Sequence, residues 1–270
     1  MKKSIKISTS SSAHPRIAGA QLLIRLGRFI QSLAVMFMRP DDLTEFSRRF
    51  YAHPSQVKHW TSEEFVAQGL NDLEKALLEK VPLRGGPLLL LGVGGGREAI
   101  PLARLGFAVT GVDFVPGMTA LARENAARQG LCLETEVQEV SRLQAPEASY
   151  DLAWLSNSMY SSIPTRERRV AMLKKIYRAL KPGGYFICTF HWEPEARFSP
   201  RVEQVRRMFA LLTLGNLWYE SGDLLWGNAE FIHAFASEAE LAAEFAEAGF
   251  TVVFLQTPST GVEGGVVLRR

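Results

Sequence analysis

Short apolar runs alternate with amphipathic stretches through the middle of the chain. Five runs have the continuous apolar character of buried strands: 87–91, 107–112, 131–137, 151–155 and 185–190. Helical patterns occupy most of the intervals, at 97–105, 116–129 and 166–180. Because strands that alternate with helices are joined by right-handed crossovers, this order predicts a parallel sheet with helices on both faces.

The end of the chain departs from this alternation. A capped helix from Ser237 to Ala248 is followed by a strand over 251–256 and another over 266–268. The interval between these two strands is too short for a helix, so they should form an antiparallel hairpin. The predicted fold class is therefore α/β, with a doubly wound, mostly parallel seven-stranded sheet, an antiparallel C-terminal hairpin, and helices at the N-terminus.

An apolar segment, 17–38, lies near the N-terminus. Arg25 and Arg28 interrupt it, which argues against both a signal peptide and a membrane span. On a helix the polar residues form one narrow stripe, and the remaining wide apolar face must be buried. Packing on the same chain or on a dimer mate is the ordinary explanation, and a helix lying on a membrane surface is the alternative.

These patterns divide the chain into three regions. Residues 1–15 are expected to be a loose tail, and 16–80 a helical lid or docking region. Residues 81–270 are expected to form a Rossmann-like domain that carries an aromatic insertion, 191–236, as a substrate cap.

Composition narrows the function classes. With 270 residues, 47% of them hydrophobic and 22% charged, the chain is an ordinary folded protein and not a disordered or fibrous one. A net charge of +3 is too small for a dedicated nucleic-acid binder. Cys132 and Cys188 lie far apart, and no His or Cys pair has metal-ligand spacing, so we expect no metal. A cytoplasmic protein acting on a small molecule is the expectation, with homo-oligomer formation and membrane association left open.

A glycine loop carries the clearest chemical signal. Gly92, Gly94, Gly95 and Gly96 stand between a predicted strand and a helix, and Asp113 ends the next strand. Glycines let a ligand approach the backbone, and a carboxylate at this place can accept both hydroxyls of a ribose. A dinucleotide site would prefer a glycine at position 97, where Arg97 stands.

The chain here resembles the class I S-adenosylmethionine-dependent methyltransferases. The resemblance rests on LLLLGVGGGREAIPLARLGFAVTGVDFVPGMTALAREN (88–125), YDLAWLSNSMY (150–160), LKPGGYFICTF (180–190) and the closing hairpin. It implies S-adenosylmethionine as the cofactor. By this resemblance Gly92, Gly94 and Gly96 border its methionine part, and Asp113 holds the ribose. The remaining positions that it implies for cofactor binding are Phe114, Glu139 and Val140 near the adenine side and Asn157 near the methionine end.

Two positions depart from the family pattern. Leu90 stands where many members have an acidic residue before the first glycine, and Glu139 replaces the commoner Asp. A non-catalytic cofactor-binding or scaffold protein of the same fold is therefore one alternative, and a nicotinamide-dependent oxidoreductase is another.

The insertion 191–236 is rich in aromatic residues. They could cover an apolar pocket or simply fasten the segment to the core. They are Trp192, Phe198, Phe209, Trp218, Tyr219, Trp226 and Phe231. A roof of this kind predicts a small apolar or planar methyl acceptor.

Methyl transfer needs a base only when the acceptor keeps its proton at neutral pH. His191 is the first candidate for that base and Tyr160 the second, with His233 and Glu193 behind them. The segment around His53, His59 and Trp60 is a candidate lid over the cofactor.

Overall fold

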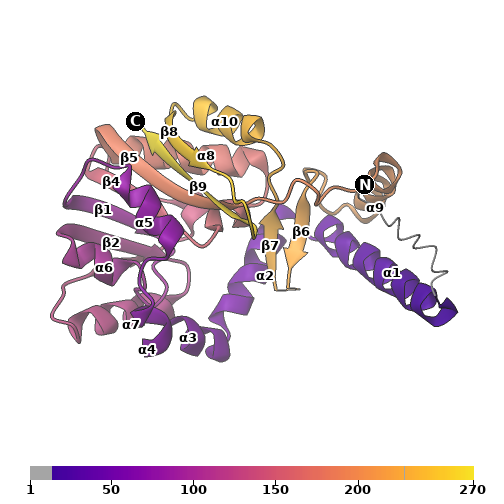
Figure 1. The fold of residues 1–270 in the computed structure, drawn as a ribbon, viewed down its shortest axis with the longest axis horizontal. Coiled ribbons are helices and arrows are strands. Elements are labelled where there is room, and N and C mark those ends of the chain that lie inside the picture. Colours follow the sequence, from indigo (N-terminus) through magenta and orange to yellow (C-terminus); the bar gives the residue numbers. More distant parts are fainter. Residues whose placement is uncertain (1–13, 228) are drawn as a thin grey trace, which may run out of the picture.

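A single seven-stranded sheet organises the body of the protein. The structure, a computed structural model, describes residues 14–227 and 229–270. The strand order is β3-β2-β1-β4-β5-β9-β8, and β9 alone runs in the direction opposite to the other six strands (Figure 1). The predicted fold class is confirmed, including the closing antiparallel pair. The strands are β1 (Gly86–Leu91), β2 (Phe107–Asp113), β3 (Glu134–Val137), β4 (Tyr150–Leu155), β5 (Leu180–His191), β8 (Thr251–Gln256) and β9 (Glu263–Arg269).

Helices cover both faces of this sheet. Side chains alternate along a strand, so Leu88 and Leu90 of β1 join one core and Leu89 and Leu91 join the other. The first core also receives α5 (Asp72–Glu79), α6 (Ala99–Arg104) and α7 (Pro116–Ala127). The second receives α8 (Arg166–Ala179) and α10 (Glu238–Glu247). The continuous apolar run of β1 is thus explained by burial on both sides.

Four more helices precede α5 in the described chain: α1 (Pro15–Phe37), α2 (Pro40–Ala52), α3 (Pro54–Trp60) and α4 (Glu63–Ala67). Proline at the first position starts each of the first three, where its missing N–H is not needed. Ser62 caps α4 by accepting a hydrogen bond from the N–H of Phe65. The tail predicted for 1–15 lies outside the described residues except for its last two, which begin α1.

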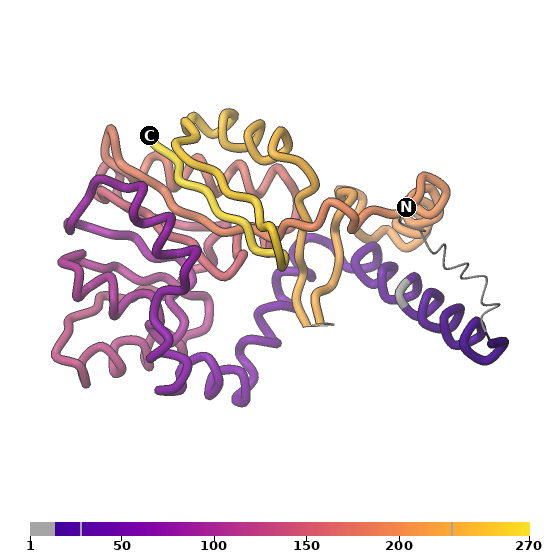
Figure 2. The backbone as a smooth tube through the Cα atoms, viewed as in Figure 1, coloured from indigo at the N-terminus to yellow at the C-terminus, as the bar shows by residue number. Residues whose placement is uncertain are grey.

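The insertion folds into a helix and a second, two-stranded sheet. These are α9 (Pro200–Thr213), β6 (Asp223–Trp226) and β7 (Glu230–His233). Together with α1 they form a lobe at one end of the molecule, called the side lobe below (Figure 2). A small apolar core holds it together: Val35, Met36, Leu43, Ala210 and Phe231.

Most of the apolar face of α1 is exposed, so packing on this chain accounts only for the end of the helix, while a dimer mate and a membrane surface stay predictions. Only the last part of the helix is buried, at Ser32, Val35 and Met36. Leu22 is 67% exposed and Phe37 62% exposed. Among the described residues, α1 is the one helix that is long enough and apolar enough to cross a membrane, judged by length and composition alone. Core helices of soluble proteins and signal sequences also pass this test.

Candidate active site

A cavity of about 850 Å³ opens at the carboxyl ends of β1, β2 and β4. The loop 92–95, the helices α2–α4 and the sheet β6–β7 contribute to its walls. This is the edge at which doubly wound sheets bind their ligands. The volume is within the range of small-molecule sites and is large enough for a cofactor together with a small acceptor.

Asp113 joins the glycine loop to the end of β2. Its Oδ2 accepts a hydrogen bond from the Gly94 N–H at 3.0 Å, and its Oδ1 accepts one from the Val115 N–H at 2.9 Å. Burial raises the pKa of the Asp113 carboxyl, and these N–H donors partly oppose the rise. Gly94 has a φ of +50° and open space where a Cβ would stand. A ribose can therefore approach the loop and reach the remaining lone pairs of Asp113.

Most of the residues predicted for cofactor binding line this cavity. They are Gly92, Gly94, Asp113, Phe114, Glu139, Val140 and Asn157. Gly96 is the exception and requires a correction: it does not line the cavity but turns the chain into α6, with Ala122 and Ile100 as neighbours. The carboxylate of Glu139 is already engaged, since it accepts from the Ser141 hydroxyl and lies 3.4 Å from Arg142.

A buried ionic network lies beside the loop and was missed from the sequence. The Arg97 guanidinium binds Glu74 through two hydrogen bonds of 2.6 and 2.9 Å and also binds Glu98. Glu98 Oε1 further accepts from Ser156 and from the Asn157 amide. Desolvation raises the pKa of Glu98. Of the two carboxylates that bind Arg97, only Glu98 lines the cavity.

Aromatic side chains from α2–α4 form much of the roof of the cavity. Tyr51, Trp60 and Phe65 all line it, and Trp60 and Phe65 pack edge to face at 4.7 Å. A Cβ at Gly95 would stand 2.4 Å from the Trp60 carbonyl oxygen, so this glycine permits the close approach. His59 lines the cavity as the lid hypothesis requires, whereas His53 caps α3 and does not.

The insertion contributes less to the roof than its composition suggested. Of its seven predicted aromatic residues, only Trp226 lines the cavity. Trp218 is 59% exposed, and Phe231 belongs to the core of the side lobe. The remaining four pack elsewhere. Phe198 lies against the Arg206 guanidinium, and Trp192 packs against the core of the body. Phe209 and Tyr219 pack against the side-lobe core. Five of the seven therefore fasten the segment to its surroundings, which is the simpler of the two explanations for its aromatic composition.

One contact closes the cavity between its two covers. The Tyr51 hydroxyl of α2 donates a hydrogen bond of 2.5 Å to the Glu230 carboxylate of β7, and both residues line the cavity. Burial raises the pKa values of both groups, and Glu230 raises that of Tyr51 further.

His191 stands at the end of β5 in the cavity wall. It is 3% exposed, its Nε2 lies 3.1 Å from Glu193 Oε2, and its ring packs against Trp226. Tyr160 requires a correction as a catalytic candidate. It is fully buried and absent from the cavity wall, and its hydroxyl donates to Glu244, which also binds Arg169.

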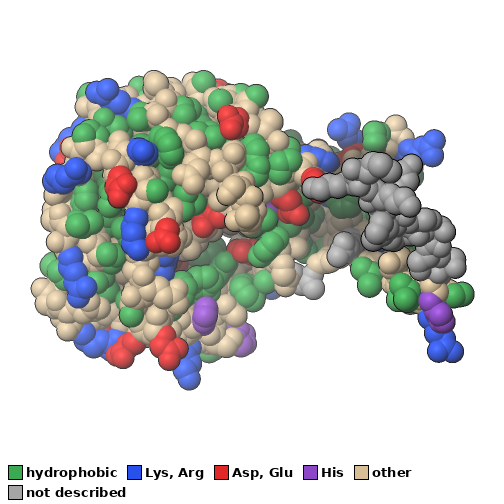
Figure 3. Space-filling model, in the orientation of Figure 1, with side chains coloured by type: hydrophobic (Ala, Val, Ile, Leu, Met, Phe, Trp, Pro, Cys, Tyr) green, Lys and Arg blue, Asp and Glu red, His purple; other side chains and the backbone are tan. Residues whose placement is uncertain are grey.

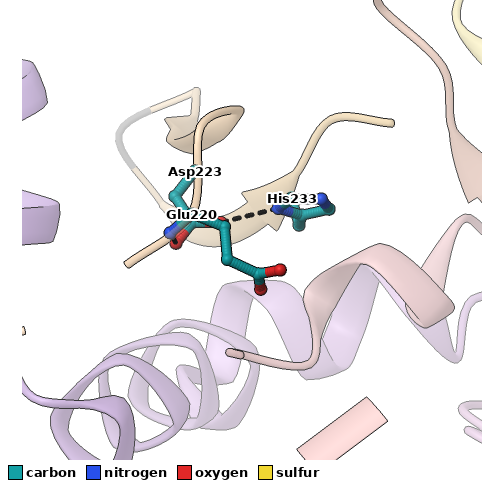
Figure 4. Close-up of side chains that lie close together, drawn as sticks. All are labelled: Glu220, Asp223 and His233. Atoms are coloured by element: carbon teal, nitrogen blue, oxygen red, sulfur yellow. Dashed lines mark hydrogen bonds and ion pairs between the residues drawn. The ribbon is translucent and has the colours of Figure 1, made fainter. Parts of the chain in front are cut away.

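His233, also a candidate base, belongs to a different buried cluster (Figure 4). Its Nδ1 lies 2.7 Å from Asp223 and its Nε2 3.2 Å from Glu240. Asp223, Glu220 and His233 lie close enough to hold a metal ion, but Arg169 binds Glu220 and both ring nitrogens of His233 face carboxylates. The arrangement is that of a satisfied ion-pair cluster, and the expectation of no metal stays a prediction.

The charge of the cavity wall is strongly one-sided. Arg97, which Glu74 and Glu98 neutralise, is the one Lys or Arg among the described lining residues. Carboxylates dominate, and burial raises the pKa values of Glu98, Asp113, Glu230 and Glu263. The lining carboxylates are Glu98, Asp113, Glu139, Glu230 and Glu263. Such a wall favours a cationic ligand and repels phosphates and carboxylates.

Fold and site together define a nucleoside-binding transferase: a seven-stranded sheet closed by antiparallel β9, with a glycine loop and a ribose-type carboxylate at one cavity. Residues 88–184 match the family model described as a methyltransferase domain. The chain is an S-adenosylmethionine-dependent methyltransferase with the class I fold. The match and the antiparallel β9 argue against the nicotinamide-dependent alternative.

Comparison with individual proteins agrees. The chain is 29% identical over 198 residues to the ubiquinone biosynthesis O-methyltransferase of Xanthomonas axonopodis pv. citri (strain 306), covering 72% of this chain and 76% of that protein. It is 27% identical over 211 residues to the ubiquinone/menaquinone biosynthesis C-methyltransferase of Brucella anthropi, covering 77% and 70%. A SAM-dependent methyltransferase from Methanosarcina mazei has the same fold, with a TM-score of 0.57, 22% identity, and coverage of 75% of this chain and 98% of that one.

Proposed function

We propose that this enzyme transfers the methyl group of S-adenosylmethionine to a hydroxyl oxygen of a neutral, planar, lipid-soluble acceptor of the phenol or hydroquinone class. The observation that carries the proposal is the cavity, which combines aromatic walls with carboxylates and no free Lys or Arg among its described lining residues. A planar neutral ring fits these walls, whereas an anionic acceptor would face several buried acids. The relatives named for ubiquinone biosynthesis support the same acceptor class.

The residues of the cavity fit S-adenosylmethionine. Asp113 would accept hydrogen bonds from the ribose hydroxyls, the open space at Gly94 would admit the sugar, and Glu98 with Asn157 would face the methionine end. When bound, the cofactor supplies an electrophilic methyl group on a positively charged sulfonium. The acidic wall around it would stabilise that charge.

Oxygen is proposed as the accepting atom because of His191. A phenolic hydroxyl must lose its proton as it is methylated, and a positioned base speeds that step. In the tautomer whose Nε2 proton faces Glu193, Nδ1 is the ring nitrogen that accepts the acceptor's proton. Glu193 would then stabilise the imidazolium that results.

The test compares neutral hydroquinones and catechols with analogues that differ only by a carboxylate or phosphate. We expect release of S-adenosylhomocysteine with the neutral compounds, and a product whose NMR spectrum shows a methoxy group. A carbon-bound methyl group would contradict the choice of oxygen, and preference for the charged analogues would contradict the acceptor class. Cofactor binding without turnover on any acceptor would favour the non-catalytic alternative.

The base is tested separately by His191→Ala. The rate should fall by roughly 10²–10⁴-fold while the affinity for S-adenosylmethionine stays close to that of the parent enzyme. His59→Ala is the matched control, since His59 also lines the cavity but lies on the lid side. A small rate loss in the His191 variant would leave catalysis to alignment of the reactants alone.

A further inference from the structure

The side lobe exposes an apolar surface that the proposed function does not use. Along α1 one series of exposed apolar residues recurs at steps of four and seven and so lies on one side of the helix, while Ile17 and Ile24, also exposed, lie on the other side. The series includes Leu22, Leu26, Ile30 and Phe37, each at least 50% exposed. The neighbouring α9 adds Met208, Leu211 and Leu212. Exposed apolar surface of this extent on a folded protein marks an interaction site.

The orientation of α1 is the reverse of that of an ordinary surface helix. Ser32, Val35 and Met36, which pack on the protein, continue the stripe that begins with Gln21 and Arg25. The polar side of the helix is therefore turned toward the rest of the side lobe and the apolar side away from it. This arrangement presents the apolar side to something outside the chain.

Charge indicates what that partner is. Residues 1–40 contain seven Lys or Arg and no Asp or Glu. Arg16, Arg25, Arg201 and Arg207 are all exposed on α1 and α9, whereas Glu203 of α9 is bound by Arg206. Figure 3 shows basic side chains at the upper edge and at the tip of this lobe and hydrophobic ones near its lower edge. The combination of an apolar face with exposed basic residues is typical of helices that lie on anionic membranes.

A second copy of the chain fits the same surface less well. Two copies joined through this surface would bring two basic segments close together, because residues 1–40 of each copy carry seven Lys or Arg and no Asp or Glu. A transmembrane orientation is also disfavoured, because Arg25 would then lie within the hydrocarbon.

We propose that α1 and α9 form a docking surface for a lipid bilayer that contains anionic phospholipids, with α1 lying in the plane of the interface. The sheet β6–β7 links this surface to the cavity. Phe231 and Leu225 pack with Val35 and Met36 in the lobe core, while Trp226 and Ile232 line the cavity. A lipid-soluble acceptor would thus reach the cavity from the membrane side. This last step rests on the proposed function, but the docking surface does not.

The first experiment is vesicle flotation of the full chain without cofactor or acceptor. We expect binding to vesicles of phosphatidylcholine mixed with phosphatidylglycerol, and much weaker binding to phosphatidylcholine alone or in high salt. The variant L22E/L26E/I30E should bind at least about a hundredfold more weakly, since each Leu or Ile that enters the apolar layer contributes about tenfold or more. The double variant Arg16→Gln, Arg25→Gln should lose about fivefold per charge on the anionic vesicles only.

The matched control is Leu105→Glu, which places a charge at an exposed apolar residue of the body, 52% exposed. It should bind vesicles like the parent protein. Melting temperature and S-adenosylmethionine affinity should be unchanged in all these variants, because none of the substituted residues lines the cavity.

Three results would overturn the proposal. Equal vesicle binding by the parent protein and the L22E/L26E/I30E variant would exclude this surface. A dimer in solution that the same variant dissociates would assign the face to a second copy. Resistance of the bound protein to alkaline extraction would assign α1 as a spanning helix.

A second readout separates docking from catalysis. With a long-chain hydroquinone held in vesicles, the L22E/L26E/I30E variant should show a raised apparent KM. With a short-chain soluble analogue its kcat/KM should equal that of the parent. If no hydroquinone is methylated but flotation behaves as expected, the proposed acceptor is wrong and the docking surface stands.

Discussion

The hydrogen bond between Tyr51 and Glu230 joins the two covers of the cavity, and Tyr51→Phe removes it with the loss of one oxygen atom. The partners are 179 residues apart in sequence and come from α2 and β7. The ring that remains keeps its contacts with Trp60 and Phe114. The substitution therefore tests the link between the covers without removing the aromatic wall.

The cost follows from the burial of both partners. A hydrogen bond to a charged buried group contributes about 1.5–3 kcal/mol, and this range is the expected loss in the free energy of unfolding while Glu230 is ionised. Burial raises the pKa of Glu230 above its ordinary value, and the Tyr51 hydroxyl lowers it again. In the variant the pKa of Glu230 should rise further, so that the carboxyl takes up a proton and part of the cost is relieved.

The pH dependence has a definite sign. A carboxyl whose pKa is raised by folding stabilises the protein fully below its unfolded pKa, near 4.5, and this stability is lost as the pH rises through the folded value. Because Tyr51→Phe raises the folded pKa of Glu230, the stability difference between variant and parent should be small below that pH. It should grow toward neutral pH.

Urea unfolding followed by tryptophan fluorescence measures these differences across the pH range. A double-mutant cycle with Glu230→Gln isolates the coupling between the two side chains, which should be about 1.5–3 kcal/mol at neutral pH. In the Tyr51→Phe variant the S-adenosylmethionine affinity should change less than the KM for the acceptor, because we expect the acceptor to enter the cavity beside the hydrogen bond between Tyr51 and Glu230. A coupling under about 0.5 kcal/mol, which is within the usual additivity error, would refute the reasoning.

Further predictions concern other parts of the molecule. Asp113→Ala should weaken S-adenosylmethionine binding by about 1–3 kcal/mol in calorimetry and also lower the melting temperature, because two backbone N–H groups lose their acceptor; unchanged affinity would contradict the site. Burial and Arg169 act to lower the pKa of His233, but its hydrogen bonds to Asp223 and Glu240 raise it overall. The protonated His233 side chain therefore stabilises the fold fully below its unfolded pKa, near 6.5, and this stabilisation is lost as the pH rises through the folded pKa. In the variant His233→Gln the melting temperature should vary less with pH across this range. An unchanged pH profile of the melting temperature would argue against a charged His233.

The sheet could be predicted from the sequence because its signals are local. The run 87–91 is apolar at every position after Pro87, as a strand buried on both faces requires, and glycines mark the ends of the helices around it. Asp113 and the glycine loop were found for the same reason, since their spacing is set by one strand, one helix and one turn.

The insertion was not predicted in detail because its folding depends on distant contacts. In α9 the charged Arg206 is buried between Phe198 and Tyr219, which breaks the amphipathic pattern that would have revealed the helix. Similarly, Tyr160 was expected at the cavity because it follows closely after the carboxyl end of β4. The short 3-10 helix Met159–Ser162 instead turns the Tyr160 side chain inward to Glu244. No pattern within the segment encodes that partner, which is 84 residues away.

The glycine loop departs from the family pattern at Leu90, and Glu98 is a candidate to supply the missing carboxylate. Leu90, which stands where the family resemblance implies an acidic residue, is fully buried in the core, so a charge there would be unpaired. Glu98, from the start of α6, instead brings a carboxylate to the cavity wall beside Asn157. We expect this carboxylate to meet the methionine amino group of the cofactor, which would offset the missing acid at position 90.

The pair Glu98→Gln and Glu74→Gln tests this expectation, because both carboxylates bind Arg97 but only Glu98 faces the cavity. Both variants should lower the melting temperature, since each weakens a buried ion pair. Only Glu98→Gln should weaken S-adenosylmethionine binding beyond that, by about 1.5–3 kcal/mol, the value of a hydrogen bond to a charged group. Neither variant should change the affinity for 5′-methylthioadenosine, which has the nucleoside but lacks the amino acid end. If Glu98→Gln weakens both ligands equally, the carboxylate acts by holding the loop in shape and the amino group must be bound elsewhere.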